Sequence, residues 1–338
     1  MKRYDKPQPA HMTNPALPVV KAGPSGASKR GSHQLASIFQ CPRKWYLRYR
    51  QGIREAKDKK FRIGGTLHHD AIAYAYAERI IEQGKWPTPS WWTGEALDDI
   101  LARHGEGWPV QVAFAREMYH AYRNYWWYGS VPEPWEPVAV EEQFVATIGE
   151  IDPIDVDDPF ADQIVTCGTD LVVRNTLTNQ LWICDHKSKG FDPFNRSRTK
   201  RMEPWVRKST GGGDHEQYAV HWQALVNLYL VRRAFPDEVV AGFIINRFTR
   251  EKTPEGKFLF DRHPLHVSPR VYERAPSVLR YAVMQESRLD GIVAAGGQPE
   301  PHYWACHGKY GSCDYIGLCN ADDEDAMNRV LTSQFVMV

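Results

Sequence analysis

The amino-acid sequence predicts an α/β protein in which a central mixed β-sheet is flanked by helices. The stretch GTDLVVRNTLTNQLWICDHKS reads as two strands joined by a tight turn around Asn179, and further apolar strands follow at VVAGFIINRF and KFLFDRHPLHV. Segments with the apolar period of helices precede and separate these strands. Strands and amphipathic helices that alternate along one chain are typical of a sheet covered by helices.

Composition narrows the class of protein. The chain has 338 residues, 42% of them hydrophobic, which suits one large domain or two closely associated lobes. Its net charge of +1 creates no global basic field, so any contact with nucleic acid must come from local patches. We find neither an apolar run long enough to span a bilayer nor a signal-peptide pattern, and we therefore expect a cytoplasmic protein without a membrane partner.

The N-terminal part is predicted to be helical. Residues 1–30 are rich in Pro, Gly, Ser and Lys, so we expect a disordered arm. SHQLASIFQCPRKWYLRYRQG then reads as one helix, and IGGTLHHDAIAYAYAERII as a second helix entered through its two glycines. On the helical period His69 falls on the buried stripe of that second helix, whereas His68 lies off it. WPVQVAFAREMYHAYRNYWWYG is a long amphipathic helix whose aromatic stripe we assign to the core.

The proline-rich stretch SVPEPWEP marks the passage from this helical lobe to the sheet, which begins at VAVEEQFVAT. We therefore expect a helical lobe over residues 31–137, which carries Cys41 and His69, and a sheet-containing core over residues 138–300. A cysteine-bearing segment at 301–320 and a short tail at 321–338 complete the predicted organisation.

Two carboxylates and one ammonium form the candidate site. Asp170 belongs to the first strand of the central pair, and Asp185 and Lys187 belong to the second. Because side chains alternate along a strand, Asp185 and Lys187 share a face while Cys184 and His186 point away. Carboxylates are the ligands that Mg²⁺ or Mn²⁺ prefers, and an ammonium can orient a water or offset developing negative charge. A D-x-K sequence alone is also compatible with a surface salt bridge.

The cysteines form a second candidate site. Three thiols lie close together near the C-terminus, and Cys41 can complete a set of four with Cys306, Cys313 and Cys319. Such a set can hold a [4Fe–4S] cluster or a structural Zn²⁺ and would tie the first helix to the end of the chain. No two of them have the short spacing common in zinc sites, which favours iron–sulfur; unconnected free thiols are the remaining alternative. The two other cysteines, Cys167 and Cys184, lie inside the central strands and are assigned to the core.

Basic residues gather in two places. The insertion GFDPFNRSRTKRMEPWVRKSTGGGD surrounds one aromatic residue with cations, including Arg196, Arg198, Lys200, Arg201 and Trp205. Such a segment suits a nucleic-acid strand, with phosphates on the cations and a base on the ring, although a solvated flexible loop explains its composition equally well. Arg43 and Lys44 lie on the basic flank of the first helix, which charge alone would assign to a solvated face.

These motifs occur in the same order in a known family. The chain resembles the RecB-like branch of the PD-(D/E)XK nucleases, in particular the iron–sulfur exonucleases of CRISPR adaptation and related phage-encoded nucleases. QLASIFQCPRKWYLRY resembles the opening helix with its first cluster cysteine, and GGTLHHD the glycine–histidine motif. CGTDLVV and WICDHKS resemble the two acid-bearing strands, and SCDYIGLC the end of the cysteine set.

The resemblance implies a restriction-endonuclease-like core and a metal-dependent DNA exonuclease that acts on single strands or ends in recombination, repair or processing. It assigns His69, Asp170 and Asp185 to Mg²⁺ or Mn²⁺, and Lys187 to the attacking water. It also places Gln223 in support of the site, with Gln217 as a rival because Asn227 stands where relatives have tyrosine.

DNA is the implied partner, together with recombination or replication proteins, and the basic residues would follow its backbone. The alternative from a different class is a DNA-binding or recombination accessory protein that keeps the fold but does not cleave.

Overall fold

The computed structural model describes residues 31–55, 59–128, 133–153, 157–189, 222–249, 252, 256–308, 311–313, 315–321 and 324–337. The predicted arm at 1–30 lies outside these residues. So does the whole basic insertion, with Arg196, Arg198, Lys200, Arg201 and Trp205, and so does Gln217. None of the described helices combines the length and the apolar character needed to cross a membrane.

One compact unit, formed mainly by residues 60–145 and 166–273, is built on a five-stranded sheet. The strands, in their order across the sheet, are β2 (Trp135–Thr147), β3 (Ile164–Asn175), β4 (Leu181–Lys189), β5 (Val240–Thr249) and β6 (Phe260–His266). β3 is antiparallel to β4, β4 is parallel to β5, and β5 is antiparallel to β6. The predicted mixed sheet is confirmed.

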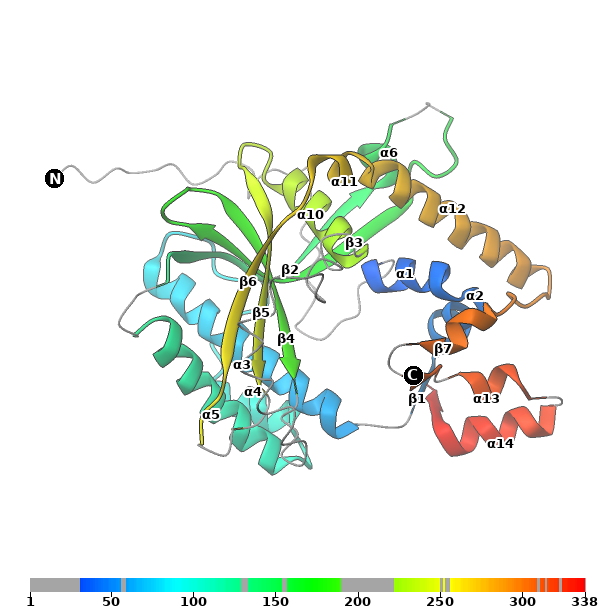
Figure 1. Cartoon of the computed structure of the whole chain (residues 1–338), viewed down its shortest axis with the longest axis horizontal. Coiled ribbons are helices and arrows are strands. Elements are labelled where there is room, and N and C mark those ends of the chain that lie inside the picture. The colour runs from blue at the N-terminus through cyan, green and yellow to red at the C-terminus, as the bar shows by residue number, and fades with distance from the viewer. Residues whose placement is uncertain are drawn as a thin grey trace. The chain divides into compact units, whose positions relative to one another are not determined.

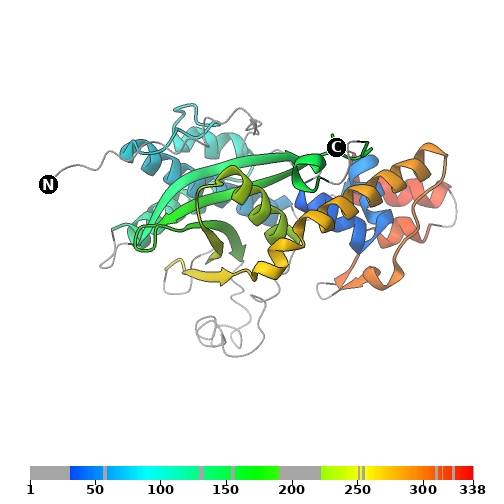
Figure 2. The ribbon, with the colours of Figure 1, turned by 90° about the horizontal axis from the view of Figure 1, so that it is seen from above.

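Helices cover both faces of this sheet. The helices of this unit are α3 (Lys59–Gln83), α4 (Leu97–His104), α5 (Pro109–Trp126), α10 (Trp222–Ala234) and α11 (Pro269–Glu273). α3 and α5 lie on one face and α10 lies on the other (Figures 1 and 2). The core beneath α3 and α5 includes Tyr119, Tyr122, Leu171, Cys184 and Ile244, all of which are buried. The aromatic stripe of α5 therefore belongs to the core, as the sequence predicted.

The turn between β3 and β4 sets the register of the two acid-bearing strands. Asn179 adopts a left-handed conformation with φ of 58°, which asparagine tolerates better than most residues. The resulting antiparallel pairing places Leu171 opposite Cys184. One step further along the same register, Asp170 and Asp185 are carried on neighbouring strands.

The other compact unit joins the two ends of the described chain, since it consists mainly of residues 31–59, 146–165 and 274–337. Its elements are α1 (Ser32–Gln40), α2 (Pro42–Trp45), η2 (Tyr46–Arg50), β1 (Ile53–Glu55), α6 (Ile148–Ile151), α12 (Ala275–Ala294), η3 (Tyr303–Cys306), β7 (His307–Gly308), β8 (Gly311–Ser312), α13 (Ile316–Cys319), α14 (Glu324–Gln334) and β9 (Phe335–Met337). β1 pairs with β9, and Gln34 of α1 donates a hydrogen bond to Glu286 of α12 at 2.6 Å. Early and late segments of the chain therefore fold together.

Two predicted helices differ from the structure. The helix expected from Ser32 onward breaks at Cys41, whose φ of −163° is extended. Proline disfavours a helical conformation at the residue before it, and Pro42 instead begins a new helix, α2. The next helix, α3, begins at Lys59, so the two glycines of its motif lie inside it rather than at its entrance. A Cβ at Gly65 would lie 3.4 Å from Ser188 Oγ, an ordinary van der Waals distance, so α3 and β4 lie side by side at this point.

Candidate metal centre

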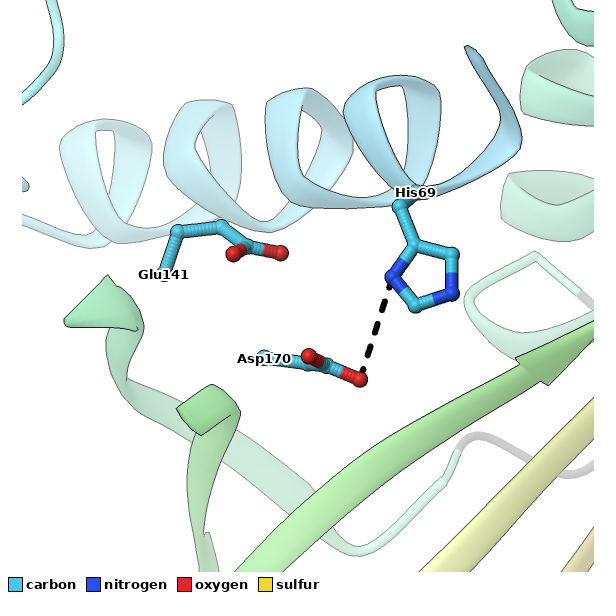
Figure 3. A group of neighbouring side chains, drawn as sticks. All are labelled: His69, Glu141 and Asp170. Atoms are coloured by element: carbon cyan, nitrogen blue, oxygen red, sulfur yellow. Dashed lines mark ion pairs between the residues drawn. The ribbon is translucent and has the colours of Figure 1, made fainter. Parts of the chain in front are cut away.

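Three side chains from three elements of the sheet-containing unit converge on one point. His69 of α3, Glu141 of β2 and Asp170 of β3 each offer one ligand atom, and these atoms all lie within 4.8 Å of one another. His69 Nδ1 lies 3.9 Å from Asp170 Oδ2, and the carboxylate of Glu141 faces the same space (Figure 3). In the described part of the chain, this is the one group of three or more such ligands. An imidazole with two carboxylates can hold a divalent cation.

Glu141 was not among the residues that we predicted from the sequence. It lies within β2 but has a left-handed φ of 49°, which is uncommon for a residue other than glycine. Glu141 and Glu142 are both half-buried, and together they interrupt the buried positions of the strand. Two adjacent acids inside the apolar stretch VAVEEQFVAT were the available signal, because a strand that packs against a core rarely places charges there without a partner.

The electrostatics of Glu141 fit a cation site. The dense protein around its carboxyl, followed by the negative charges of Asp170, Asp70 and Asp185, raises the pKa of Glu141 well above its ordinary value. When these carboxylates are ionised they repel one another. A bound divalent ion would compensate their negative charge. The donor set and its charge therefore suit Mg²⁺ or Mn²⁺.

Asp185 lies outside the group of three and is held by its neighbours. The side chain is buried; Lys187 Nζ lies 2.7 Å from its Oδ2, and Gln223 Nε2 donates a hydrogen bond to its Oδ1 at 2.9 Å. The predicted alternation is confirmed, since Cys184 belongs to the core under α3 while Asp185 and Lys187 share the opposite face. Asp185 still acts on the metal centre, because its charge contributes to the raised pKa of Glu141.

His186, between Asp185 and Lys187, holds the side chain of Asp170 in place. Its backbone N–H donates a hydrogen bond to Asp170 Oδ2 at 2.5 Å. Its imidazole is buried beneath α3, where burial lowers the pKa of His186 to about 3, and the ring is therefore neutral. Asn246 Nδ2 lies 2.9 Å from His186 Nδ1, so the amide donates and this ring nitrogen accepts. The sequence indicated only that His186 points away from the acids.

The burial of the two adjacent histidines of α3 is the opposite of what we predicted. His68 is 2% exposed and lies with its ring edge-on to Phe248 at 5.8 Å, whereas the side chain of His69 is 30% exposed. The helical stripe predicted the reverse. That reasoning fails because α3 is buried around most of its circumference, so one stripe does not define its inner face. His69 is nevertheless the histidine beside Asp170, as the family motif implies.

The four predicted cluster cysteines all belong to the other compact unit. The N–H groups of Lys44 and His302 both donate to Cys41 Sγ at 3.5 Å. β7 and β8 form a small hairpin, and at its open end the Cys313 N–H donates to the Cys306 carbonyl oxygen at 2.7 Å. Burial, followed by the charge of Cys41, raises the pKa of Cys319 to about 11, and the charges of Cys313 and Cys306 add to this effect. The charges of Cys41, Cys306 and Cys313 therefore reach Cys319, but among the described residues no three of the four sulfur atoms lie within 4.8 Å of one another.

The remaining cysteines and the basic residues of α2 can also be assigned. Cys167 and Cys184 are buried within the sheet, as predicted for core residues. Arg43 and Lys44 lie on α2; Arg43 is hydrogen-bonded to Gln298, and its guanidinium lies 5.7 Å from the centre of the Tyr46 ring.

A mixed sheet with acids on two neighbouring strands, a D-x-K strand and a helical histidine defines a class of metal-dependent nucleases. The family model described as PD-(D/E)XK nuclease superfamily matches residues 33–320, and the chain belongs to this superfamily. Membership implies metal-dependent hydrolysis of phosphodiester bonds, with nucleic acid as the substrate. No curated protein matches the chain closely enough to be counted as a relative.

Proposed function

We propose that this chain is a metal-dependent DNA exonuclease that acts on single strands or on DNA ends, in recombination, repair or the processing of DNA. The observation that carries the proposal is the convergence of His69, Glu141 and Asp170 next to Asp185 and Lys187. The order of motifs along the chain, which resembles that of the RecB-like exonucleases, supports the choice of DNA and of an exonuclease.

In this mechanism His69, Glu141 and Asp170 hold Mg²⁺ or Mn²⁺, with Asp185 on the neighbouring strand as a further oxygen ligand. When bound, the ion lowers the pKa of a water and offsets charge on the phosphate. The backbone N–H of His186 keeps the Asp170 carboxylate oriented, at a distance of 2.5 Å. Asp170 therefore needs little rearrangement to bind the ion.

Lys187 serves the attacking water in this proposal. Its ammonium lies 2.7 Å from Asp185 Oδ2, on the face of β4 that carries the acid. From there it donates a hydrogen bond to the water or offsets the negative charge that develops on the phosphate. Gln223 fixes the other oxygen of Asp185 at 2.9 Å, which limits the rotation of the carboxylate.

A [4Fe–4S] cluster held by Cys41, Cys306, Cys313 and Cys319 forms the second part of the proposal. The two backbone N–H groups that donate to Cys41 Sγ are of the kind that stabilises a metal-bound thiolate. A cationic centre would also allow the thiols to ionise, against the burial and mutual repulsion that raise the pKa of Cys319.

Structural Zn²⁺ is the alternative occupant. The spacing argument against it loses its force, because the β7–β8 hairpin brings Cys306 and Cys313 opposite one another despite their separation in sequence. The resemblance of the cysteine set to that of the iron–sulfur exonucleases supports the cluster over zinc. Among the described residues no three of these sulfurs come within 4.8 Å of one another, so the thiols would have to move together to hold one Zn²⁺, whose ligand sulfurs lie about 3.8 Å apart.

The proposal is tested by cleavage of end-labelled single-stranded DNA, double-stranded DNA and RNA with Mg²⁺, Mn²⁺ or EDTA. We expect end-dependent cleavage of DNA that EDTA abolishes and that Asp185→Asn reduces about 100-fold or more. Asp98→Asn, on exposed α4, is the matched control. If Asp185→Asn leaves cleavage unchanged, the proposal that this chain is the nuclease is wrong. DNA binding without any cleavage would favour the alternative, a DNA-binding accessory protein. Iron and sulfide in protein purified without oxygen would separate the cluster from zinc.

A further inference from the structure

A cavity of about 220 Å³ lies in the sheet-containing unit and is not used by the proposed chemistry. Asp70 and Ala73 of α3 form one wall, and residues 91–95 together with the last residues of α4 form the others. Two indole rings, those of Trp91 and Trp92, line it, with their centres 5.9 Å apart and their planes at 65°. We name it the tryptophan cavity.

The tryptophan cavity is attached to the strand segment that carries Glu141. Trp91 Nε1 donates a hydrogen bond to the Val140 carbonyl oxygen at 2.8 Å, and the Ser90 N–H donates to Glu142 Oε1 at 3.1 Å. The loop that forms the cavity is therefore fixed to the residues on either side of Glu141. Asp70, in its opposite wall, directly follows His69, which is one of the three candidate metal ligands. The cavity is thus a neighbour of the metal centre.

The charges in the cavity are paired. Asp70 lies 2.8 Å from His104, and Glu95 lies 2.5 Å from Arg103. Two carboxylates that already have cationic partners disfavour a phosphate, but they leave donors and acceptors for a neutral polar ring. Aromatic walls with a few polar groups are the usual surroundings of a bound nucleobase.

The volume points to the same class of ligand. The cavity volume of about 220 Å³ lies below the range of about 300–1,000 Å³ that is typical of sites for drug-sized molecules. A single heterocyclic base fits this space better than a complete nucleotide or a longer segment.

We propose that the tryptophan cavity receives one nucleobase of the bound strand, close to the phosphate that is cleaved. The inference rests on the proposed function for the identity of the strand, and it adds a contact that positions the strand through stacking. Trp92 is the stacking residue in this arrangement, and it packs against Tyr74, whose ring centre lies 4.8 Å away.

Binding without turnover tests the proposal. Fluorescence anisotropy in EDTA would compare a labelled single-stranded oligonucleotide with versions that lack one base at each successive position from the end. For the parent protein we expect one position at which base removal weakens binding about fivefold or more, as stacking on an aromatic residue predicts. Trp92→Ala should bind the intact oligonucleotide equally weakly and lose the dependence on that position, whereas Trp92→Phe should retain most of it. Tyr281→Ala, which removes an exposed ring from α12, is the control.

A second variant keeps the test valid if Trp92→Ala does not fold. Ile100→Trp fills the cavity from α4 and should also abolish the dependence on one base. The proposal is overturned if no position is sensitive in the parent, or if Trp92→Ala or Ile100→Trp keeps the full sensitivity. Failure of the proposed function is a different result: the base-dependent binding would persist in EDTA, but no DNA would be cleaved on addition of Mg²⁺ or Mn²⁺.

Discussion

The metal centre and the cysteine set differ in how the chain supports their ligands. His69, Glu141 and Asp170 lie on a long helix and two long strands, and hydrogen bonds orient Asp170 and the neighbouring Asp185. Cys306 and Cys319 instead end elements of four residues, and Cys313 directly follows a strand of two residues. Elements this short have few hydrogen bonds of their own.

The comparison indicates two relations between site and fold. The sheet holds the acids against their mutual repulsion, so we expect the fold to keep the candidate metal centre in place without the ion. For the cysteine set we expect the reverse relation, in which the bound centre holds the short elements together. The predictions below test this difference, beginning with the largest effect.

At the metal centre, loss of the Lys187 ammonium should change the cleavage rate alone. We expect Lys187→Met to lower the cleavage rate about 100- to 1000-fold while metal affinity and thermal stability change little, because the His186 N–H and the Gln223 amide still hold Asp170 and Asp185 in place. Single-turnover kinetics, calorimetric titration with Mn²⁺ and thermal unfolding measure the three quantities. Lys252→Met, at an exposed ion pair with Glu117, is the control. A large loss of stability would show that the sheet does not support this site independently.

At the cysteine set, loss of one thiol should lower the stability of the surrounding elements. We expect Cys319→Ser to release the bound centre and to lower the opening free energy of residues 303–337 by about 3 kcal/mol or more, since a bound ligand stabilises only the state that holds it. Hydrogen exchange should show this loss in β9 and α14 while β3, β4 and β5 keep their protection. Cys184→Ala, a buried cysteine of the sheet, should leave the metal content unchanged. If hydrogen-exchange protection is equal with and without the bound centre, the cysteine set does not depend on its centre, and the two sites do not differ in this respect.

Gln223 sharpens the description of the first site. Gln223→Ala removes the hydrogen bond to Asp185 Oδ1, and we expect cleavage to slow about 10-fold, the effect of one hydrogen bond to a charged group. Gln223→Glu should slow it further, because a second carboxylate would face Asp185. Rates at saturating Mn²⁺ measure both effects, and an unchanged rate in Gln223→Ala would reassign the supporting role.

Glu141 should give the smallest effect on stability and a clear dependence on pH. Since the pKa of Glu141 is raised in the folded protein, its contribution to stability is present at low pH and is lost as pH rises through that raised pKa. Glu141→Gln stays neutral, so without metal its free energy of unfolding should exceed that of the parent increasingly as pH rises. Urea unfolding in EDTA at several pH values measures the difference. Glu117→Gln is the control, and a constant difference across pH would contradict the assignment.

The same acid should link metal binding to protons. Because the cation binds the ionised carboxylate, binding to the parent should release a proton and strengthen with pH. Titration calorimetry in buffers of different ionisation enthalpy measures this release, which Glu141→Gln should reduce.

Local patterns placed Asp170 and Asp185 on the two central strands, and the family resemblance assigned them to a metal. Alternation placed Asp185 and Lys187 on one face, and a single asparagine marked the turn that aligns their strand with that of Asp170. Glu141 was not predicted, because its left-handed backbone breaks the alternation of side chains along the strand on which the prediction relied. The helical period also failed for His68 and His69, since it identifies an inner face only where one side of a helix meets solvent.

The sequence by itself determined the strands, the D-x-K pattern and the grouping of cysteines, because each depends on residues that are near one another in the chain. Only the tertiary structure brought Glu141 to His69 and Asp170, and only the hairpin of β7 and β8 set Cys306 opposite Cys313. The physical reason is that contacts between distant segments depend on packing and on single backbone torsions, and no local pattern records these.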